Sequence, residues 1–290
     1  MLSRLWKKKS SSTIGIDRFQ GLFYGVRLEQ SGQQTRLTHF GQGQTLEELA
    51  GSLGKADRVI SRPPSGAYYN RRVSYIKSDL RSTSDLKPVE RHVVVYFECQ
   101  RFCPMPVEQT VFGWRLLQYN EASGESVVEI HQSDLESCER QSQVLAKLRL
   151  GQPRLDAWHP TVLTPLIPDR FQWHVQQTRE PDGFALLKDG HLHGHLSPQA
   201  LTPGGKHFDR LCSFYEEYKK SGQRGSLQVF FLQRSFRAPK VSGISCSWIG
   251  DNCAELLGQG LEENYLQPVG LALGKKPTWW LRHKSTKWLD

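Results

Sequence analysis

The residues best suited to chemistry lie near the start of the chain, in the run Ile14-Gly15-Ile16-Asp17. An apolar strand with a glycine and a carboxylate before a tight turn can hold a phosphate. Backbone N–H groups of the turn reach the phosphate oxygens, and the carboxylate holds Mg²⁺, usually through water. The turn, however, reads Arg18-Phe19-Gln20-Gly21, which is bulky where a phosphate needs room. A second apolar run follows, so the pattern predicts a β-hairpin whose turn can bind a phosphate only poorly.

A second polar pattern has the residue types of a metal site. Asp189, His191, His193 and His195 alternate along a predicted strand and so share one face. Side chains two positions apart on a strand lie ~6.6 Å from each other, too far for all four to reach one ion. The six cysteines supply no partners at zinc-site spacing. We therefore predict no metal site, and free, buried thiols in a reducing compartment.

The composition is that of a globular protein with an excess of positive charge. Of 290 residues, 23% are charged and 38% are hydrophobic, and the formal net charge is +9. No apolar run reaches the roughly 20 residues that a membrane helix needs, and the first residues lack the apolar core of a secretory signal. We therefore expect a cytoplasmic protein.

Both ends of the chain combine basic residues with tryptophan. Residues 1–12 contain Trp6 and Lys7-Lys8-Lys9, and residues 275–290 contain Trp279, Trp280 and Trp288 among further basic residues. Indole rings and basic side chains suit the interface of an anionic membrane. Solvated termini with a few packed aromatic residues would look the same, so both interpretations stay open.

Two successive units of strands followed by a helix are predicted along the chain. The first contains a helix that a capping box of Ser133 and Glu136 opens and Gly151 ends. Residues 85–100 are ambiguous, because residues 93–97 favour a strand whereas Pro88 suits the first turn of a helix. The second unit has strands at residues 171–177, 184–187, 191–196 and 244–248, and helices at residues 206–220, 252–257 and 269–274. The repetition predicts an α/β protein of two related lobes.

The most specific stretch of the sequence is a proline elbow. It reads Phe102-Cys103-Pro104-Met105-Pro106-Val107-Glu108 and leads into Phe112-Gly113-Trp114-Arg115-Leu116-Leu117. This stretch resembles the elbow of PilM, the actin-like cytoplasmic protein of type IV pilus assembly, where an Ile-Pro-x-Pro-x-Glu-Glu run precedes an Asp-Phe-x-Val strand. Gln109 replaces the second glutamate of that pattern, and Gly113 replaces the aspartate.

Other landmarks of the PilM family follow in the same order over about residues 13 to 274. Among them are Leu187-Lys188-Asp189-Gly190, Pro203-Gly204-Gly205 and Gly270-Leu271-Ala272-Leu273. The resemblance implies an α/β fold of the actin-like (ribonuclease H-like) type with two lobes, at residues 13–160 and 161–274. A subdomain would be inserted in the first lobe at about residues 80–125, and a basic leader (1–12) and a basic tail (275–290) would flank the lobes. The short chain resembles the reduced relatives used for DNA uptake, of the HofM and ComA type.

The resemblance also implies an ATP and Mg²⁺ site, which this sequence carries in degenerate form. Gly15 and Asp17 match the first phosphate hairpin, and Gly204 and Gly205 match a glycine pair before a helix. The second hairpin has Gln176-Gln177-Thr178 where the family has Asp-Ile-Gly, so its carboxylate and glycine are missing. The adenosine loop reads Ser247-Trp248-Ile249-Gly250, with tryptophan in the space of the nucleoside. We therefore expect no ATPase activity, no catalytic residue and no bound cofactor.

PilM-like proteins accept the cytoplasmic N-terminal peptide of a PilN-like inner-membrane protein, which implies a scaffold at the membrane face. An apolar trough for that peptide is expected from residues of the elbow and the next strand: Pro104, Met105, Pro106, Val107, Phe112 and Trp114. The same residues could instead be the hinge and core of the subdomain. A nucleotide-dependent switch and a nucleic-acid-binding protein are the alternative functions, although no nucleic-acid-binding motif accompanies the positive charge. Pilus assembly, DNA uptake and type II secretion stay open as settings.

Overall fold

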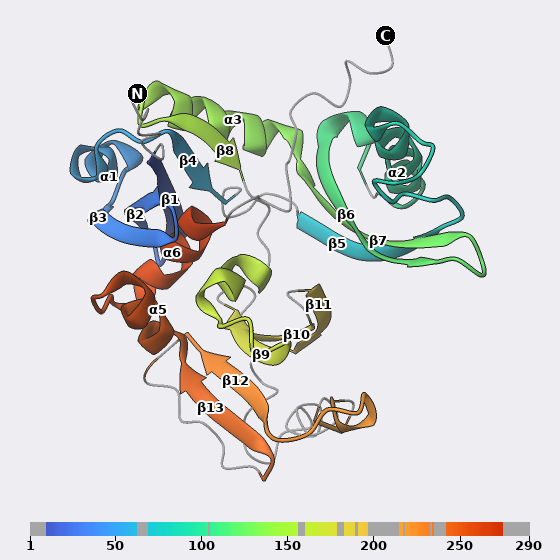
Figure 1. The fold of residues 1–290 in the computed structure, drawn as a ribbon. Coiled ribbons are helices and arrows are strands. Elements are labelled where there is room, and N and C mark those ends of the chain that lie inside the picture. The colour runs from blue at the N-terminus through green and yellow to red at the C-terminus, as the bar shows by residue number, and fades with distance from the viewer. Residues whose placement is uncertain are drawn as a thin grey trace, which may run out of the picture. The chain divides into compact units, whose positions relative to one another are not determined.

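The computed structural model describes residues 10–62, 69–103, 105–155, 160–178, 183–188, 191–196, 215–216, 218–232, 234 and 242–274. They fall into two compact units. Figure 1 shows the helices and strands of the described residues. The first unit comprises the described parts of Met1–Gly15, Tyr24–Gly41 and His159–Gly274, and the second those of Ile16–Phe23 and Gln42–Trp158. No helix in the described ranges is both long and apolar enough to cross a membrane.

One five-stranded sheet has the order β3-β2-β1-β4-β8. Its strands are β1 (Ser11–Phe19), β2 (Leu22–Ser31), β3 (Gln34–Gly43), β4 (Arg58–Ser61) and β8 (Gln152–Leu155). Five successive residues of β1 are buried, which is the pattern of a strand covered on both faces. β4 and β8 run parallel. Helix α1 (Leu46–Leu53) follows β3, and the Thr45 hydroxyl caps it by accepting the Glu48 backbone N–H at 3.2 Å.

The second five-stranded sheet repeats this order as β11-β10-β9-β12-β13. Its strands are β9 (Trp173–Thr178), β10 (Gly183–Lys188), β11 (His191–Leu196), β12 (Leu227–Phe231) and β13 (Ile244–Trp248). β9, β10 and β11 form an antiparallel meander, and β12 runs parallel to both β9 and β13. In each sheet a three-strand meander is thus followed by two later strands on its β1 or β9 side. The predicted repetition of related units is present.

A separate three-stranded sheet forms a subdomain with helix α2. The strand order is β5-β7-β6, with β5 (Tyr69–Ile76), β6 (Thr110–Asn120) and β7 (Glu125–Asp134). Residues 93–97, which favoured a strand, lie within α2 (Pro88–Phe102). Helix wins because Pro88 occupies the first turn, the Glu90 carboxylate accepts the Lys87 backbone N–H at 2.6 Å, and Val95 and Cys99, one turn apart, are buried against the sheet.

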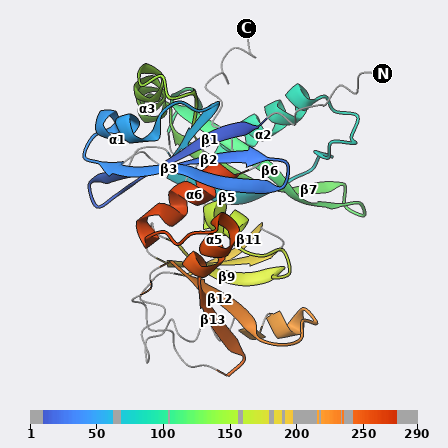
Figure 2. The ribbon, with the colours of Figure 1, turned by 60° about the vertical axis from the view of Figure 1, so that its left-hand side comes forward.

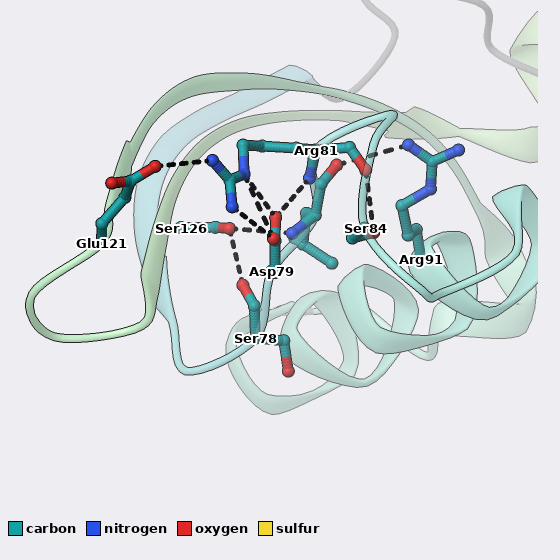
Figure 3. A network of polar contacts seen from close by, with 8 residues as sticks. Ser78, Asp79, Arg81, Ser84, Arg91, Glu121 and Ser126 are labelled. Carbon is teal, nitrogen blue, oxygen red and sulfur yellow. Dashed lines mark hydrogen bonds and ion pairs between the residues drawn. The ribbon is translucent and has the colours of Figure 1, made fainter.

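The loop between β5 and α2 is pinned to the sheet by a buried hydroxyl. Ser126, at the start of β7, donates to the Ser78 carbonyl at 2.6 Å and accepts the Leu80 backbone N–H at 3.0 Å (Figure 3). Two backbone groups of the loop are therefore satisfied by one side chain. This arrangement fixes the turn that brings the chain from β5 to the start of α2.

A charged cluster reinforces the same loop from the solvent side. The Arg81 guanidinium binds both carboxylate oxygens of Asp79 and reaches Glu121 at 3.0 Å (Figure 3). It also lies 4.0 Å from the ring centre of Tyr119. The hydrogen bond from Arg81 lowers the pKa of the Asp79 carboxyl, and Asp79 raises the pKa of Arg81 in return. Because the cluster is solvent-exposed, it orders the loop more than it stabilises the fold.

Helix α3 (Leu135–Lys147) differs from the prediction at both ends. Its N-cap is Asp134, whose carboxylate accepts the Ser137 backbone N–H at 2.8 Å, so Ser133 is not the cap. Ser133 lies one residue earlier and is still part of β7. The helix ends at Lys147, and Arg149 takes a left-handed conformation (φ 51°) before Gly151 is reached. Gly151 instead permits close contact, since a Cβ there would lie 2.4 Å from the Ala56 carbonyl oxygen.

Four helical segments of the first unit accompany its second sheet. It contains η2 (Pro160–Leu166), α5 (Ile249–Leu257), η4 (Glu263–Tyr265) and α6 (Leu266–Leu273). α5 and α6 pack against each other (Figure 2), and η2 contacts both. α6 is buried all round, as expected of a helix inside a core. Of the helix predicted at residues 206–220, residues 215–216 and 218–220 are described and are helical.

Candidate functional site

Gly15 allows β1 to lie directly against helix α6. A Cβ at this position would lie 1.9 Å from the Pro268 carbonyl oxygen and 2.9 Å from the Ala272 backbone nitrogen. Any side chain would therefore force the helix off the strand. Within the described residues, the absence of a side chain at Gly15 serves packing between a strand and a helix.

Asp17 lies two residues before the end of β1 and is neutralised by Arg62. Its Oδ1 accepts hydrogen bonds from Arg62 Nε at 2.7 Å, from Arg62 Nη2 and from the Arg18 backbone N–H at 2.8 Å. Asp17 is 1% exposed and Arg62 is 7% exposed, so the pair is shielded from water. Inside a protein such a pair persists because each charge satisfies the other. The carboxylate thus already has a cation, which the chain itself supplies.

Sequence reasoning did not identify Arg62 as part of this site. Arg62 comes directly after the buried β4 residues Val59, Ile60 and Ser61. Its place after a buried strand could have suggested a buried ion pair, but it could not identify Asp17 as the partner, because Asp17 and Arg62 are 45 residues apart in sequence. The pairing depends on strand order, which places β4 beside β1 in the sheet.

The turn of the first hairpin is tight and carries large side chains. Gln20 and Gly21 both have positive φ (48° and 85°), as in the two-residue turns that match the twist of a β-hairpin. The Arg18 guanidinium lies 5.1 Å from the ring centre of Phe23, on the returning strand. Arg18 is therefore folded onto its own hairpin.

Gln176 holds the position in the second sheet that Asp17 holds in the first. Each lies two residues before the end of the strand that starts the meander, β9 and β1 respectively. Gln176 is buried and uncharged. The side chain of Gln177 is engaged elsewhere, since its Oε1 accepts the Leu232 backbone N–H at 2.8 Å. The second hairpin therefore offers no carboxylate to a metal ion at either position.

Trp248 fills the space at the start of α5. Its Nε1 donates to the Leu232 carbonyl at 3.0 Å. The ring covers Gly250, where a Cβ would lie 2.2 Å from two of its carbons, and the Arg234 guanidinium lies 4.8 Å from the ring centre. The indole of Trp248 therefore occupies the segment that, by the family resemblance, corresponds to the adenosine loop. Gly204 and Gly205, also predicted for this site, lie outside the described residues.

The predicted peptide trough is divided between core and surface. Phe112 is 2% exposed and belongs to the subdomain core, with its ring stacked on His92 at 4.7 Å. Trp114 is half-buried, and its Nε1 reaches His92 Nδ1 at 3.4 Å. Met105 is half-buried and Pro106 is exposed. Phe112 thus fits the hinge-and-core interpretation, whereas Met105 and Pro106 are open to a partner.

Two members of the predicted trough are not fully placed. Pro104 lies outside the described residues, and Val107 is described only as the first residue of η1 (Val107–Gln109). Two aromatic side chains of α2, Phe97 and Phe102, are 57% and 41% exposed. Phe102 is the last residue of α2 and the first of the elbow, so its exposed ring adds apolar surface there.

Metal and thiol chemistry find no support in the described part of the chain. No group of three or more His, Cys, Asp or Glu side chains there could hold a metal ion. β11 is present as predicted, although the side chains of its histidines are not among those described. Burial raises the pKa of the Cys138 and Cys253 thiols to about 11, which makes them unreactive. All five described cysteines are free.

Comparison with known proteins shows the fold. No protein-family model and no curated protein sequence matches the chain. A chain of the solved PilM–PilN type IV pilus biogenesis complex is similar in structure, with a TM-score of 0.55 and 14% identity over 90% of this chain and 97% of that one. A Bacteroides thetaiotaomicron protein of unknown function with an actin-like ATPase fold matches with 11% identity, 89% and 92% coverage and a TM-score of 0.37.

An Aquifex aeolicus PPX-GPPA enzyme matches more weakly, with 9% identity, 77% and 68% coverage and a TM-score of 0.29. The similarity to the PilM–PilN structure extends over nearly the whole of both chains. Together with the repeated sheet order, it confirms the predicted α/β, actin-like fold.

Proposed function

We propose that this protein is a PilM-like scaffold of a type IV pilus or DNA-uptake machine that does not hydrolyse ATP. It would bind the cytoplasmic N-terminal peptide of a PilN-like inner-membrane protein and so work at the cytoplasmic face of that membrane. The observation that carries the proposal is the structural similarity to a chain of the PilM–PilN complex over 97% of that chain's length.

The two hairpins support the absence of hydrolysis. Phosphoryl transfer depends on Mg²⁺ held near the phosphates, and Mg²⁺ demands oxygen ligands in a near-octahedral arrangement. Asp17 Oδ1 already accepts three N–H groups, two of them from the Arg62 guanidinium. To bind there, Mg²⁺ would have to displace a buried cation. The described residues of the two hairpins therefore do not fit a Mg–ATP complex.

The surface beside the elbow supports a docking role. Phe102 and Pro106 are exposed, and Met105 is half-buried between them in sequence. Phe102 is the last residue of α2, and Met105 and Pro106 lie between α2 and η1, outside helix and strand. Apolar side chains on such a segment suit a peptide that binds in an extended form, because such a peptide loses little further conformational freedom.

The proposal is tested by isothermal titration calorimetry with synthetic N-terminal peptides from the organism's inner-membrane pilus and competence proteins. We expect one peptide to bind with micromolar affinity, and Met105→Asp to weaken that binding at least tenfold without loss of the folded state. Val89→Asp is the matched control, since Val89 is also exposed and apolar but lies near the other end of α2, roughly 20 Å away along the helix. If no peptide binds, or if both variants weaken binding equally, the proposed docking surface is wrong.

A further inference from the structure

Nearly all of the excess positive charge of the chain lies in two short basic segments, residues 1–9 and 275–290. The first contains four Lys or Arg residues and no Asp or Glu, and the second contains five against one. Together they carry +8 of the formal net charge of +9, so the 265 residues between them carry +1. The attraction of this protein to anionic surfaces is therefore concentrated in the two basic segments.

The basic segments also combine tryptophan with leucine. They contain four of the eight tryptophans of the chain, and three of these four stand next to a leucine, in Leu5-Trp6, Trp280-Leu281 and Trp288-Leu289. Indole rings suit the headgroup depth of a bilayer, leucine suits the acyl boundary below it, and basic side chains attract anionic headgroups. Nucleic acid would attract the same charge and stack on indole, but it has no apolar layer for leucine. The composition therefore favours a lipid surface.

Both basic segments lie outside the described residues, but the structure shows where they join the first unit. Strand β1 begins at Ser11, shortly after the first segment, and α6 ends at Leu273, shortly before the second. β1 and α6 lie in direct contact, because a Cβ at Gly15 would lie 2.9 Å from the Ala272 backbone nitrogen (Figure 2). Gly15 is four residues, ~13 Å, from the start of β1. The start of β1 and the end of α6 therefore lie within about 25 Å of each other.

We propose that residues 1–9 and 275–290 together bind the surface of an anionic lipid bilayer and attach this protein to it directly. The lysines and arginines attract the headgroups, and the adjoining tryptophan and leucine side chains enter the interface. The attachment needs no membrane protein, so it is independent of the proposed docking of a PilN-like peptide.

The neighbouring attachment of the two basic segments matters for the strength of binding. A single short membrane anchor binds only marginally and reversibly, and stable attachment takes two anchors that act together. Chains of 9 and 16 residues span at most ~30 Å and ~55 Å, so from attachment points about 25 Å apart both segments reach one patch of bilayer. Once one segment is bound, the other is held at a high effective concentration above the same surface. The fold thus makes one bivalent anchor from two weak ones.

The test is co-sedimentation of the full chain with vesicles, in the absence of any peptide. Vesicles that mix phosphatidylglycerol with phosphatidylcholine should bind the protein, and vesicles of phosphatidylcholine alone should not. Each basic residue near an anionic surface contributes about fivefold to the binding constant, so changing the three lysines at 7–9 to Gln should weaken binding about 100-fold at low salt. The matched control changes three exposed lysines of the described chain to Gln, namely Lys55, Lys147 and Lys220, and should have little effect. Equal losses in the two triple variants would show that net charge alone drives the binding, and would overturn the proposal.

A second variant tests the tail and separates lipid from nucleic acid. Trp279→Ser with Trp280→Ser keeps every charge and should still weaken vesicle binding by roughly tenfold or more, because two large apolar side chains no longer enter the interface. It should also reduce the quenching of tryptophan fluorescence by lipids with brominated chains. A gel shift with single-stranded and duplex DNA gives the competing outcome. If the full chain does not bind phosphatidylglycerol vesicles, or if the basic segments bind DNA instead, the lipid assignment is wrong.

Discussion

Replacing Arg62 by methionine removes the cation that neutralises Asp17 but keeps an apolar stem of similar length. Asp17 then loses the two hydrogen bonds that the guanidinium donates and remains buried at 1% exposure without that cation, although the Arg18 N–H still donates to it. An ion left without its partner in such surroundings costs about 3–5 kcal/mol of unfolding free energy. We therefore expect Arg62→Met to be among the most destabilising single changes in this protein.

The size of the effect is measured by urea unfolding, followed by far-UV circular dichroism and tryptophan fluorescence. Arg140→Met is the matched control, because Arg140 forms an exposed ion pair with Glu136 one helical turn away, worth about 0.5 kcal/mol or less. The double variant Asp17→Asn with Arg62→Met removes both charges, and should recover about 2–3 kcal/mol relative to Arg62→Met alone. A loss below about 1 kcal/mol in Arg62→Met, or no recovery in the double variant, would refute the buried pair.

Three further outcomes follow from packing, hydrogen bonding and ionisation. Gly15→Ala should lower the unfolding free energy by about 1–3 kcal/mol, because its Cβ would overlap the backbone of α6. Gly51→Ala on α1, where nothing lies within 4 Å of the new Cβ, should raise the unfolding free energy by about 0.5–1 kcal/mol. Chemical denaturation measures both changes. Ser126→Ala should lower the unfolding free energy by about 1–3 kcal/mol, because it leaves two backbone groups of the loop unsatisfied. Ser84→Ala removes a less buried hydroxyl and should lower it by less. Equal losses in the two variants would contradict the role of Ser126 in holding the loop. Because burial lowers the pKa of His174, the unfolded chain binds the proton of this histidine at a higher pH than the folded protein does. Stability should therefore fall as the pH drops below about 6.5 and level off below the folded-state pKa. Melting temperatures measured over a pH series should show this fall in the wild type and not in His174→Phe, and an unchanged series in the variant would count against it.

Local sequence patterns were enough to find most of the strands and hairpins, although β12 was not predicted, and the repetition was enough to find two related units. They failed where packing decides between two local preferences. Val93 to Phe97 favour a strand by residue type, but the burial of Val95 and Cys99 against a sheet formed from distant segments makes them helical. The cap of α3 was misplaced by one residue, because Ser133 and Asp134 are both good caps, and it is the Asp134 carboxylate that accepts the Ser137 backbone N–H.

The candidate site was predictable only in part, for a related reason. Asp17 could be identified from its neighbours, since a carboxylate at the end of an apolar strand is unusual. Its partner Arg62 comes from a strand 45 residues later, and no local rule links the two. Phe112, in the strand after the elbow, was a candidate for both the trough and the core, and strand alternation turns it toward α2 and the core. Long-range pairing and the direction of side chains are set by the fold.

The most direct test of the central proposal is the affinity of the PilN-like peptide with and without Mg–ATP. Because the carboxylate of the first hairpin is already paired with Arg62, docking should not depend on nucleotide. Calorimetry should give the same micromolar dissociation constant in millimolar Mg–ATP as in its absence, and no phosphate should be released. Peptide binding that appears only with Mg–ATP, or that accompanies phosphate release lost in Asp17→Ala, would contradict a scaffold that works without hydrolysis.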